Sequence, residues 1–247
     1  MSQSALQALI FDVDGTLADT ERVHMAAFNH AFAEEGLDWH WDETLYTRLL
    51  DISGGKERIL AHWKSTRGEL LDVDGSAVRD TVQRLHDLKT AAYEAEIKSG
   101  VAGLRPGVLN LLEDARRQGI TLAIATTTSP VNIAALLCSA LGSDWRLLFS
   151  VIGDASTASL KKPHPQVYLQ MLQALKLPPQ ACLAFEDSSN GLRSATGAGI
   201  GTVITPTHFT AGHDFSRALR VLPSLAGVGL ADLRAWRDSP IHTVNSR

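Results

Sequence analysis

Five short apolar runs recur along the chain, and most of them lack the alternation of apolar and polar residues that marks a half-exposed strand. They are residues 7–11, 120–125, 147–152, 181–185 and 201–205. Continuous apolar runs are typical of strands buried on both faces of a parallel sheet. The helical patterns between them are residues 107–118, 131–141, 165–176 and 189–198. This alternation predicts right-handed βαβ units, and hence an α/β fold with a doubly wound, Rossmann-like parallel sheet.

Residues 19–99 break the alternation directly after the first run, because they contain consecutive helical patterns and no convincing strand. The helices are predicted at 20–35, 43–50, 55–66 and 77–97. We interpret this stretch as an α-helical domain inserted into the α/β core. The predicted domains are a catalytic core of residues 1–17 and 100–247 and an inserted helical domain of residues 18–99. Glycines near residue 100 could act as a hinge between them.

Composition excludes several classes of protein without changing the predicted fold. Hydrophobic residues make up 45% and charged residues 20% of the 247 positions, which is typical of a globular protein. The net charge of −4 predicts no nucleic-acid partner. No apolar run approaches the roughly 20 residues that cross a bilayer, and the start lacks a secretory pattern, so we expect no membrane partner. Cys138 and Cys182 lie in apolar runs, which predicts buried thiols, and we expect a cytoplasmic monomer.

The tetrapeptide DVDG occurs twice, at residues 12–15 and 72–75. The first copy follows an apolar run, which predicts Asp12 at the carboxyl end of a strand, where open α/β sheets bind ligands. The second copy lies between two helical patterns, where Gly75 and Ser76 favour a turn and a helix start. Only the first copy is therefore predicted to belong to a functional site.

Three later motifs follow other predicted strands in a fixed order. Thr126 ends the strand in "LAIATTTS", Lys162 stands before a proline in "KKPHP", and Glu186 and Asp187 follow the run in "LAFEDSSNG". Each motif alone is also explained by a helix cap, a solvated loop charge or a surface acidic pair. Because the carboxyl ends of parallel strands meet at one edge of the sheet, their joint presence with Asp12 favours a single site.

The order of these motifs resembles that of the haloacid dehalogenase superfamily, and within it the phosphosugar phosphatases and mutases with a small helical cap. The similarity extends over essentially the whole chain and is most evident to the CbbY-type xylulose-1,5-bisphosphate phosphatases. It rests on "FDVDGTLADTE", "SGGKERI", "LRPGV", "ATTTS", "KKPHP" and "EDSSNGLRSA". The resemblance implies a Mg²⁺-dependent phosphoric monoester hydrolase that converts xylulose-1,5-bisphosphate to xylulose-5-phosphate, a reaction connected to the Calvin cycle.

The resemblance also implies a role for each motif residue. Asp12 would be the nucleophile that forms an aspartyl-phosphate, and Asp14 the general acid and base, which requires a proton on Asp14 when substrate binds. Thr126 and Lys162 would stabilise the charge of the transferring group. Clustered carboxylates favour Mg²⁺. The expected metal ligands are Asp12, Asp14 through its backbone carbonyl, Asp187, and Glu186 either directly or through another ligand.

The inserted domain carries the expected substrate contacts. In "SGGKER", two glycines allow a ligand to approach the backbone, and two cations suit a second phosphate; the alternative is a helix N-terminus with two solvated charges. The predicted contacts to this small phosphosugar are Glu21, His24, Gly54, Gly55, Lys56 and Arg58 from the inserted domain, and Thr127 and Asn132 from the core. Trp39 and Trp41 are predicted to form part of the core of the inserted domain.

Two other functions share these features. A phosphosugar mutase of the β-phosphoglucomutase type has the same motifs and the same type of cap, and differs in whether water or a sugar hydroxyl accepts the phosphoryl group. A non-catalytic sugar-phosphate sensor could use the same fold. A sensor could dispense with Asp12, Asp14 or Lys162, and the chain retains all three.

Overall fold

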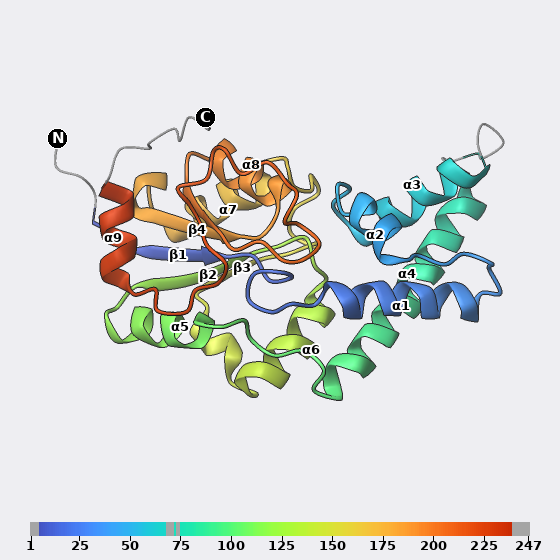
Figure 1. The fold of residues 1–247 in the computed structure, drawn as a ribbon, viewed down its shortest axis with the longest axis horizontal. Coiled ribbons are helices and arrows are strands. Elements are labelled where there is room, and N and C mark those ends of the chain that lie inside the picture. Colours follow the sequence, from blue (N-terminus) through green and yellow to red (C-terminus); the bar gives the residue numbers. More distant parts are fainter. Residues whose placement is uncertain (1–4, 68–71, 73–74, 239–247) are drawn as a thin grey trace.

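A parallel sheet of six strands forms the centre of the computed structural model, which describes residues 5–67, 72 and 75–238 (Figure 1). The strands are β1 (Ala8–Phe11), β2 (Thr121–Ala125), β3 (Val151–Gly153), β4 (Cys182–Glu186), β5 (Gly201–Ile204) and β6 (Arg220–Val221). Their order is β3-β2-β1-β4-β5-β6, and all neighbours are parallel. The chain runs outward from β1 to β3 and returns to the other side of β1 at β4. The switch point of this doubly wound sheet therefore lies between β1 and β4.

Helices cover both faces of the sheet (Figure 1). One face packs against α5 (Val108–Arg117), α6 (Pro130–Leu141) and α9 (Leu230–Asp238), and the other against α7 (Gln166–Leu175) and α8 (Ser189–Gly197). Within β1, Leu9 and Phe11 belong to the first of these cores, whereas Ala8 and Ile10 belong to the second. Because successive side chains enter opposite cores, the strand is apolar at every position.

The structure differs from the sequence prediction in three places. Residues 147–152 are not one strand, because Trp145–Leu148 form a 3₁₀ helix anchored by buried Trp145, and β3 begins only at Val151. The sequence patterns predicted neither strand β6 nor helix α9. Cys138 is exposed, because it lies on the face of α6 opposite to the residues that pack in the core, whereas Cys182 is buried as predicted.

The stretch between β1 and α5 is helical, as the sequence predicted, and lies to one side of the sheet (Figure 1). Its helices are α1 (Glu21–Glu34), α2 (Glu43–Leu49), α3 (Gly55–Arg67) and α4 (Ser76–Lys98). Helix α1 packs along α4, and α4 also contacts α6 of the core. Trp41 is fully buried among Phe28, Phe32 and Tyr46, and Trp39 packs against the same cluster, so both tryptophans are core residues of this helical part.

The second DVDG copy precedes a helix. Gly75 is the N-cap residue of α4, which starts at Ser76, and the Gly75 N–H donates to the carbonyl of exposed Asp72. Val73 and Asp74 lie outside the described residues. The turn and helix start predicted for this copy are confirmed at Gly75 and Ser76.

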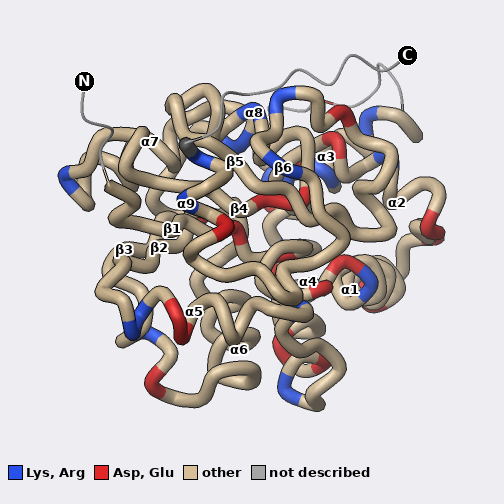
Figure 2. Tube along the Cα trace, turned by 60° about the vertical axis from the view of Figure 1, so that its left-hand side comes forward, with Lys and Arg blue, Asp and Glu red and all other residues tan. Residues whose placement is uncertain are grey.

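Charged residues of both signs are interspersed along the described chain (Figure 2). None of the helices among the described residues is long and apolar enough to cross a membrane.

We expect buried His62 to make the free energy of unfolding depend on pH. Its ring packs edge-on against Trp39 and Trp41, and burial lowers its pKa below the usual 6.5. The unfolded chain then binds a proton at a higher pH than the folded chain, so the free energy of unfolding falls as the pH drops below the unfolded value. This contribution should be present at about pH 7.5 and smaller at about pH 5.5.

Urea unfolding of wild type and His62→Leu at the two pH values measures this contribution. The His62→Leu variant should lose less stability on acidification than wild type. The matched control is His40→Leu, which removes an exposed histidine and should change the pH dependence less than His62→Leu does. Equal acid sensitivity of wild type and His62→Leu would show that the folded state tolerates a proton on this imidazole.

Candidate active site

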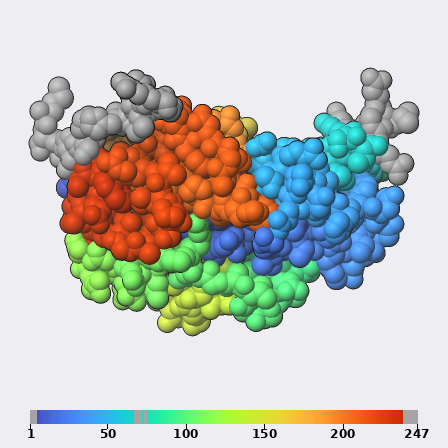
Figure 3. Space-filling view, in the orientation of Figure 1, coloured from blue at the N-terminus to red at the C-terminus, as the bar shows by residue number. Residues whose placement is uncertain are grey.

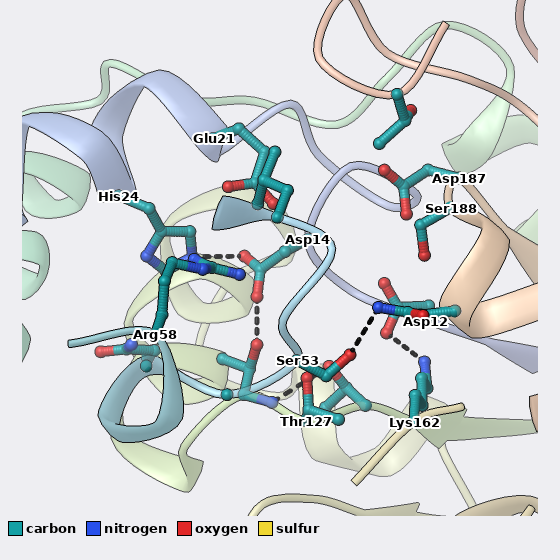
Figure 4. A pocket seen from close by; sticks show the side chains of 18 of the residues that line it. Asp12, Asp14, Glu21, His24, Ser53, Arg58, Thr127, Lys162, Asp187 and Ser188 are labelled. Atoms are coloured by element: carbon teal, nitrogen blue, oxygen red, sulfur yellow. Dashed lines mark hydrogen bonds and ion pairs between the residues drawn. The ribbon is translucent and has the colours of Figure 1, made fainter. Parts of the chain in front are cut away.

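A pocket lies between the carboxyl edge of the sheet and the inserted helices (Figure 4). From the core it is lined by Asp12, Asp14, Thr126, Thr127, Asn132, Lys162, Glu186 and Asp187, and from the inserted helices by Glu21, His24, Gly54, Gly55, Arg58, His86 and Lys89. Eleven of the twelve residues predicted for catalysis and substrate binding are in this set, as are all four predicted metal ligands.

Asp12 occupies the switch point of the sheet. Its backbone N–H continues the β1–β4 ladder by donating to the carbonyl of Phe185, which fixes the residue directly beyond the strand. The carboxylate is nearly buried and accepts a hydrogen bond of 2.7 Å from Lys162 Nζ (Figure 4). Burial raises the pKa of Asp12, and the charge of Lys162 and a hydrogen bond from Thr126 only partly oppose this rise. A nucleophilic Asp12 therefore needs a further positive charge to favour its ionised form.

Lys162 joins two carboxylates that lie far apart in the sequence. Its Nζ lies 2.7 Å from Asp12 Oδ1 and 2.6 Å from Glu186 Oε1, and the side chain is 5% exposed. Although burial alone would lower it, the charges of Asp12 and Glu186 raise the pKa of Lys162. The ammonium group is therefore charged, and it donates two hydrogen bonds within the site.

Three buried carboxylates form a cluster with the geometry of a cation site. One oxygen each of Asp12, Glu186 and Asp187 lies within 4.8 Å of the others. Burial, followed by the charges of Asp12 and Glu186, raises the pKa of Asp187 well above its usual range, and Glu186 Oε2 is buried without a hydrogen-bond partner. Gly15, at φ +76°, allows this approach, since a Cβ there would lie 2.4 Å from Asp187 Oδ2. Such a group of oxygen ligands fits a divalent cation.

The carboxylate of Asp14 is not part of this cluster and faces the inserted helices instead (Figure 4). It accepts hydrogen bonds from Thr20 Oγ1 at 2.6 Å, from His24 Nε2 at 2.9 Å and from the Thr128 hydroxyl. Lys89 Nζ lies 2.7 Å from His24 Nδ1 and is buried. A charged ammonium group has no acceptor, so it donates to Nδ1 and thereby orients the Nε2–H of His24 towards Asp14.

This network decides the ionisation state of Asp14. Although burial alone would raise it, His24, followed by hydrogen bonds from Thr128 and Thr20, lowers the pKa of Asp14. Asp14 is therefore ionised in this arrangement, whereas a general acid must carry a proton. The role predicted from the sequence requires substrate binding to change the network around Asp14, because a negatively charged phosphate nearby would favour the protonated form.

Lys56 is the predicted substrate contact that the structure does not bring to the pocket. Its side chain is exposed, and its ammonium group contacts Gln83 on the surface of the inserted helices. The physical reason is the start of α3 at Gly55: residues three apart share a helix face, so Gly55 and Arg58 both line the pocket, while Lys56 points elsewhere.

Several pocket residues had no prediction from the sequence. Lys89 belongs to a buried stripe of α4 that also contains Leu85, Tyr93 and Ile97, and a lysine at an otherwise apolar position of a helix is a signal that could have revealed it. Thr128 is the third threonine of "TTT", and nothing local distinguishes it from its neighbours. The sequence patterns also gave no prediction for Thr20, which donates to Asp14 from outside the pocket, or for the lining residues His86, Ser188, Asn190, Thr210 and His213.

Comparison with known proteins identifies the family. The family model of haloacid dehalogenase-like hydrolases matches residues 6–199. The chain belongs to the haloacid dehalogenase-like hydrolases. Plasmid-borne protein CbbY of Cupriavidus necator is 50% identical to it over 94% of this chain and 96% of that protein. The phosphatase class of hydrolase predicted from the sequence is confirmed by this membership and similarity.

Solved structures of similar proteins agree with the observed hydrolase fold. A mutant of CbbY from Rhodobacter sphaeroides in complex with xylulose-1,5-bisphosphate superposes with a TM-score of 0.85 at 41% identity, covering 92% of this chain and 99% of the other. A β-phosphoglucomutase from Clostridium difficile superposes with a TM-score of 0.75 at 23% identity, covering 94% and 97% of the two chains, and shows the shared fold alone. The predicted resemblance to CbbY-type proteins is confirmed.

Proposed function

We propose that this hydrolase is a Mg²⁺-dependent phosphatase that converts xylulose-1,5-bisphosphate to xylulose-5-phosphate through an aspartyl-phosphate on Asp12. The observation that carries the proposal is one pocket with basic side chains at both ends. Lys162 and the carboxylate cluster lie at one end, and Lys89 and Arg58 lie at the other. The similarity to a CbbY protein that binds xylulose-1,5-bisphosphate supports this substrate.

In the proposed reaction, an ionised oxygen of Asp12 attacks the phosphorus of the C1 phosphate, and the bond from phosphorus to the sugar oxygen breaks. Asp14 gives a proton to that oxygen as it leaves and later accepts one from the water that hydrolyses the aspartyl-phosphate. Lys162 and Thr126 stabilise negative charge on the transferring group. Bound Mg²⁺ would supply positive charge that favours ionised Asp12 and neutralises phosphate oxygens. The proposed ligands of Mg²⁺ are Asp12, Glu186, Asp187 and the backbone carbonyl of Asp14.

The second phosphate would bind between Arg58 and Lys89. Arg58 donates to the carbonyls of Leu49 and Ile52 at 3.0 and 3.2 Å, which holds its guanidinium at the pocket. Burial lowers the pKa of Lys89 to about 8. A phosphate beside it would raise this pKa and favour the charged ammonium form. The remaining proposed contacts to the sugar are Glu21, His24, Gly54, Gly55, Thr127 and Asn132, of which Asn132 Oδ1 is buried without a partner.

Arg58→Met should weaken the binding of a bisphosphate much more than that of a monophosphate. A charge-assisted hydrogen bond contributes about 1.5–3 kcal/mol, so KM for xylulose-1,5-bisphosphate should rise about 10- to 100-fold. KM for a pentulose carrying only the reacting phosphate should change little. Steady-state phosphate release on the two substrates measures both values.

The matched control is Lys56→Met, which removes another cation from the same helix but outside the pocket. It should leave both KM values at the wild-type level. An increase in KM for Lys56→Met comparable to that for Arg58→Met would place the distal phosphate on the surface of α3 and contradict the proposed subsite.

We also propose that residues 18–99 act as a cap on a core of residues 1–17 and 100–247, and that closure excludes water from the site. Two core segments support this. Asn190 Nδ2, at the start of α8, donates to the Asp51 carbonyl at 2.9 Å and to Ser53 Oγ at 3.2 Å. Phe209, in the segment after β5, is buried in the hydrophobic cluster of the inserted helices. Figure 3 shows the two parts in contact on one face of the molecule.

The proposal also covers the oligomeric state and the cellular location of the enzyme. We propose that the enzyme acts as a monomer. The proposed setting is the cytoplasm and, because of the proposed substrate, the Calvin cycle.

The test is phosphate release with Mg²⁺ across pentulose and hexose mono- and bisphosphates. We expect the highest kcat/KM for xylulose-1,5-bisphosphate. Equal rates on all substrates would contradict a pocket selective for bisphosphates. Conversion of glucose-1-phosphate to its isomer without free phosphate, in the presence of a trace of sugar bisphosphate, would establish the mutase instead.

A further inference from the structure

Tyr168 lies beneath the pair formed by Lys162 and Glu186, outside the pocket itself. It is fully buried on the first turn of α7, six residues after the lysine. Its hydroxyl lies 2.5 Å from Glu186 Oε1, and the Lys162 Nζ lies 5.5 Å from the centre of its ring. One aromatic side chain therefore contacts both the cation and a carboxylate of the site.

The two oxygens of Glu186 have different surroundings. Oε1 accepts hydrogen bonds from Lys162 and from Tyr168. Oε2 is buried without a partner and lies against Gly191, where an added Cβ would be only 1.8 Å away. Two donors thus hold one oxygen in place, and the close backbone of α8 leaves the other oxygen little freedom to move.

We propose that Tyr168 is a positioning residue that holds Glu186 by Oε1 and so keeps Oε2 as a free ligand atom for the divalent cation. The inference rests on the proposed function, because it concerns the Mg²⁺ site described there. Outer partners that fix the orientation of a ligand raise metal affinity without contacting the metal. The hydroxyl is the group that matters: phenylalanine would preserve the ring beneath Lys162 but would leave Glu186 Oε1 with one donor instead of two.

Tyr168→Phe should therefore bind Mg²⁺ about 10-fold more weakly than wild type, the lower end of the effect seen when such outer partners are removed. Isothermal titration calorimetry with Mg²⁺ alone, in the absence of substrate, measures the affinity directly. Thermal unfolding of the metal-free proteins shows whether the variant is folded. The matched control is Tyr46→Phe, which removes a buried hydroxyl that also donates to a glutamate, Glu21, at 2.7 Å but lies away from the carboxylate cluster. It should leave Mg²⁺ affinity unchanged.

A double-mutant cycle with Glu186→Gln separates positioning from a general loss of packing. If Tyr168 acts through Glu186, adding Tyr168→Phe to Glu186→Gln should weaken Mg²⁺ binding less than about 2-fold, well below its effect in wild type. Wild-type affinity in Tyr168→Phe, or a full additional loss in the double variant, would overturn this inference and leave the proposed phosphatase intact. Failure of wild type itself to bind Mg²⁺ would overturn the metal assignment and this inference together.

Discussion

Asp12→Asn is expected to reduce phosphate release at least about 10⁴-fold, because the amide cannot form the aspartyl-phosphate. The fold should remain intact. The carboxylate of Asp12 lies in a cluster of buried acids, and burial raises its pKa, which shows that its charge is unfavourable there. Asparagine has nearly the same shape and no charge, so it should fit this site without destabilising the fold. Phosphate release from xylulose-1,5-bisphosphate and thermal unfolding measure the two outcomes.

The control is the same substitution at the first aspartate of the other DVDG. Asp72 is exposed and precedes the N-cap of α4, so Asp72→Asn should retain activity close to that of wild type. A loss in Asp72→Asn as large as in Asp12→Asn would show that the two copies were assigned the wrong way round. Undiminished turnover in Asp12→Asn would exclude this residue as the nucleophile.

Lys162→Met should impair both activity and stability. Removing one partner of a buried ion pair costs about 3–5 kcal/mol, because the remaining charges stay buried without compensation. Here the remaining charges are Asp12 and Glu186, which contact the same ammonium group. Turnover should fall about 10²- to 10³-fold, as for the loss of one preorganised donor to the reacting group. Urea unfolding at neutral pH and steady-state phosphate release check these values.

The destabilisation by Lys162→Met should depend on pH in a defined direction. Burial raises the pKa of Asp12 and Glu186, and without the lysine both would rise further. Groups with a raised pKa bind protons more tightly in the folded state, so their unfavourable effect is small at low pH and grows as the pH rises through the folded value. The difference from wild type should therefore be smaller at about pH 5.5 than at about pH 7.5. The matched control, Lys64→Met, removes an exposed lysine of α3 and should show no such difference. A pH-independent loss in Lys162→Met would indicate packing, not charge, as its cause.

The core of the site could be predicted from the sequence because it depends on the sheet. Asp12, Thr126, Glu186 and Asp187 each follow or end an apolar run, and parallel strands deliver their carboxyl ends to one edge. Lys162 could be predicted to belong to the site because its motif, KKPHP, lies directly before α7. The element that failed, residues 147–152, is one where an apolar run covers a 3₁₀ turn as well as a strand, which periodicity cannot separate.

The residues that the sequence did not reveal depend on packing between distant elements. Lys89 reaches His24 only because α4 packs along α1, and Asn190 reaches Ser53 only because the inserted helices lie over the start of α8. The Lys56 prediction failed for a local reason, since the residue at which α3 starts determines which side chains of "SGGKER" face the pocket. If α3 started one residue earlier or later, different side chains of this motif would face the pocket, and the sequence does not define helix ends to within one residue.

Trapping of the covalent intermediate tests the central claim most directly. Wild-type enzyme mixed with xylulose-1,5-bisphosphate labelled with ³²P at C1, then quenched in acid during the first turnover, should carry protein-bound label. Borohydride reduction releases the phosphate and converts the phosphorylated aspartate to homoserine, so peptide mass spectrometry should find homoserine in place of Asp12. The Asp12→Asn variant should carry no label and yield no homoserine. Complete turnover with no protein-bound label at any time, or homoserine in place of an aspartate other than Asp12, would contradict phosphoryl transfer through this aspartate.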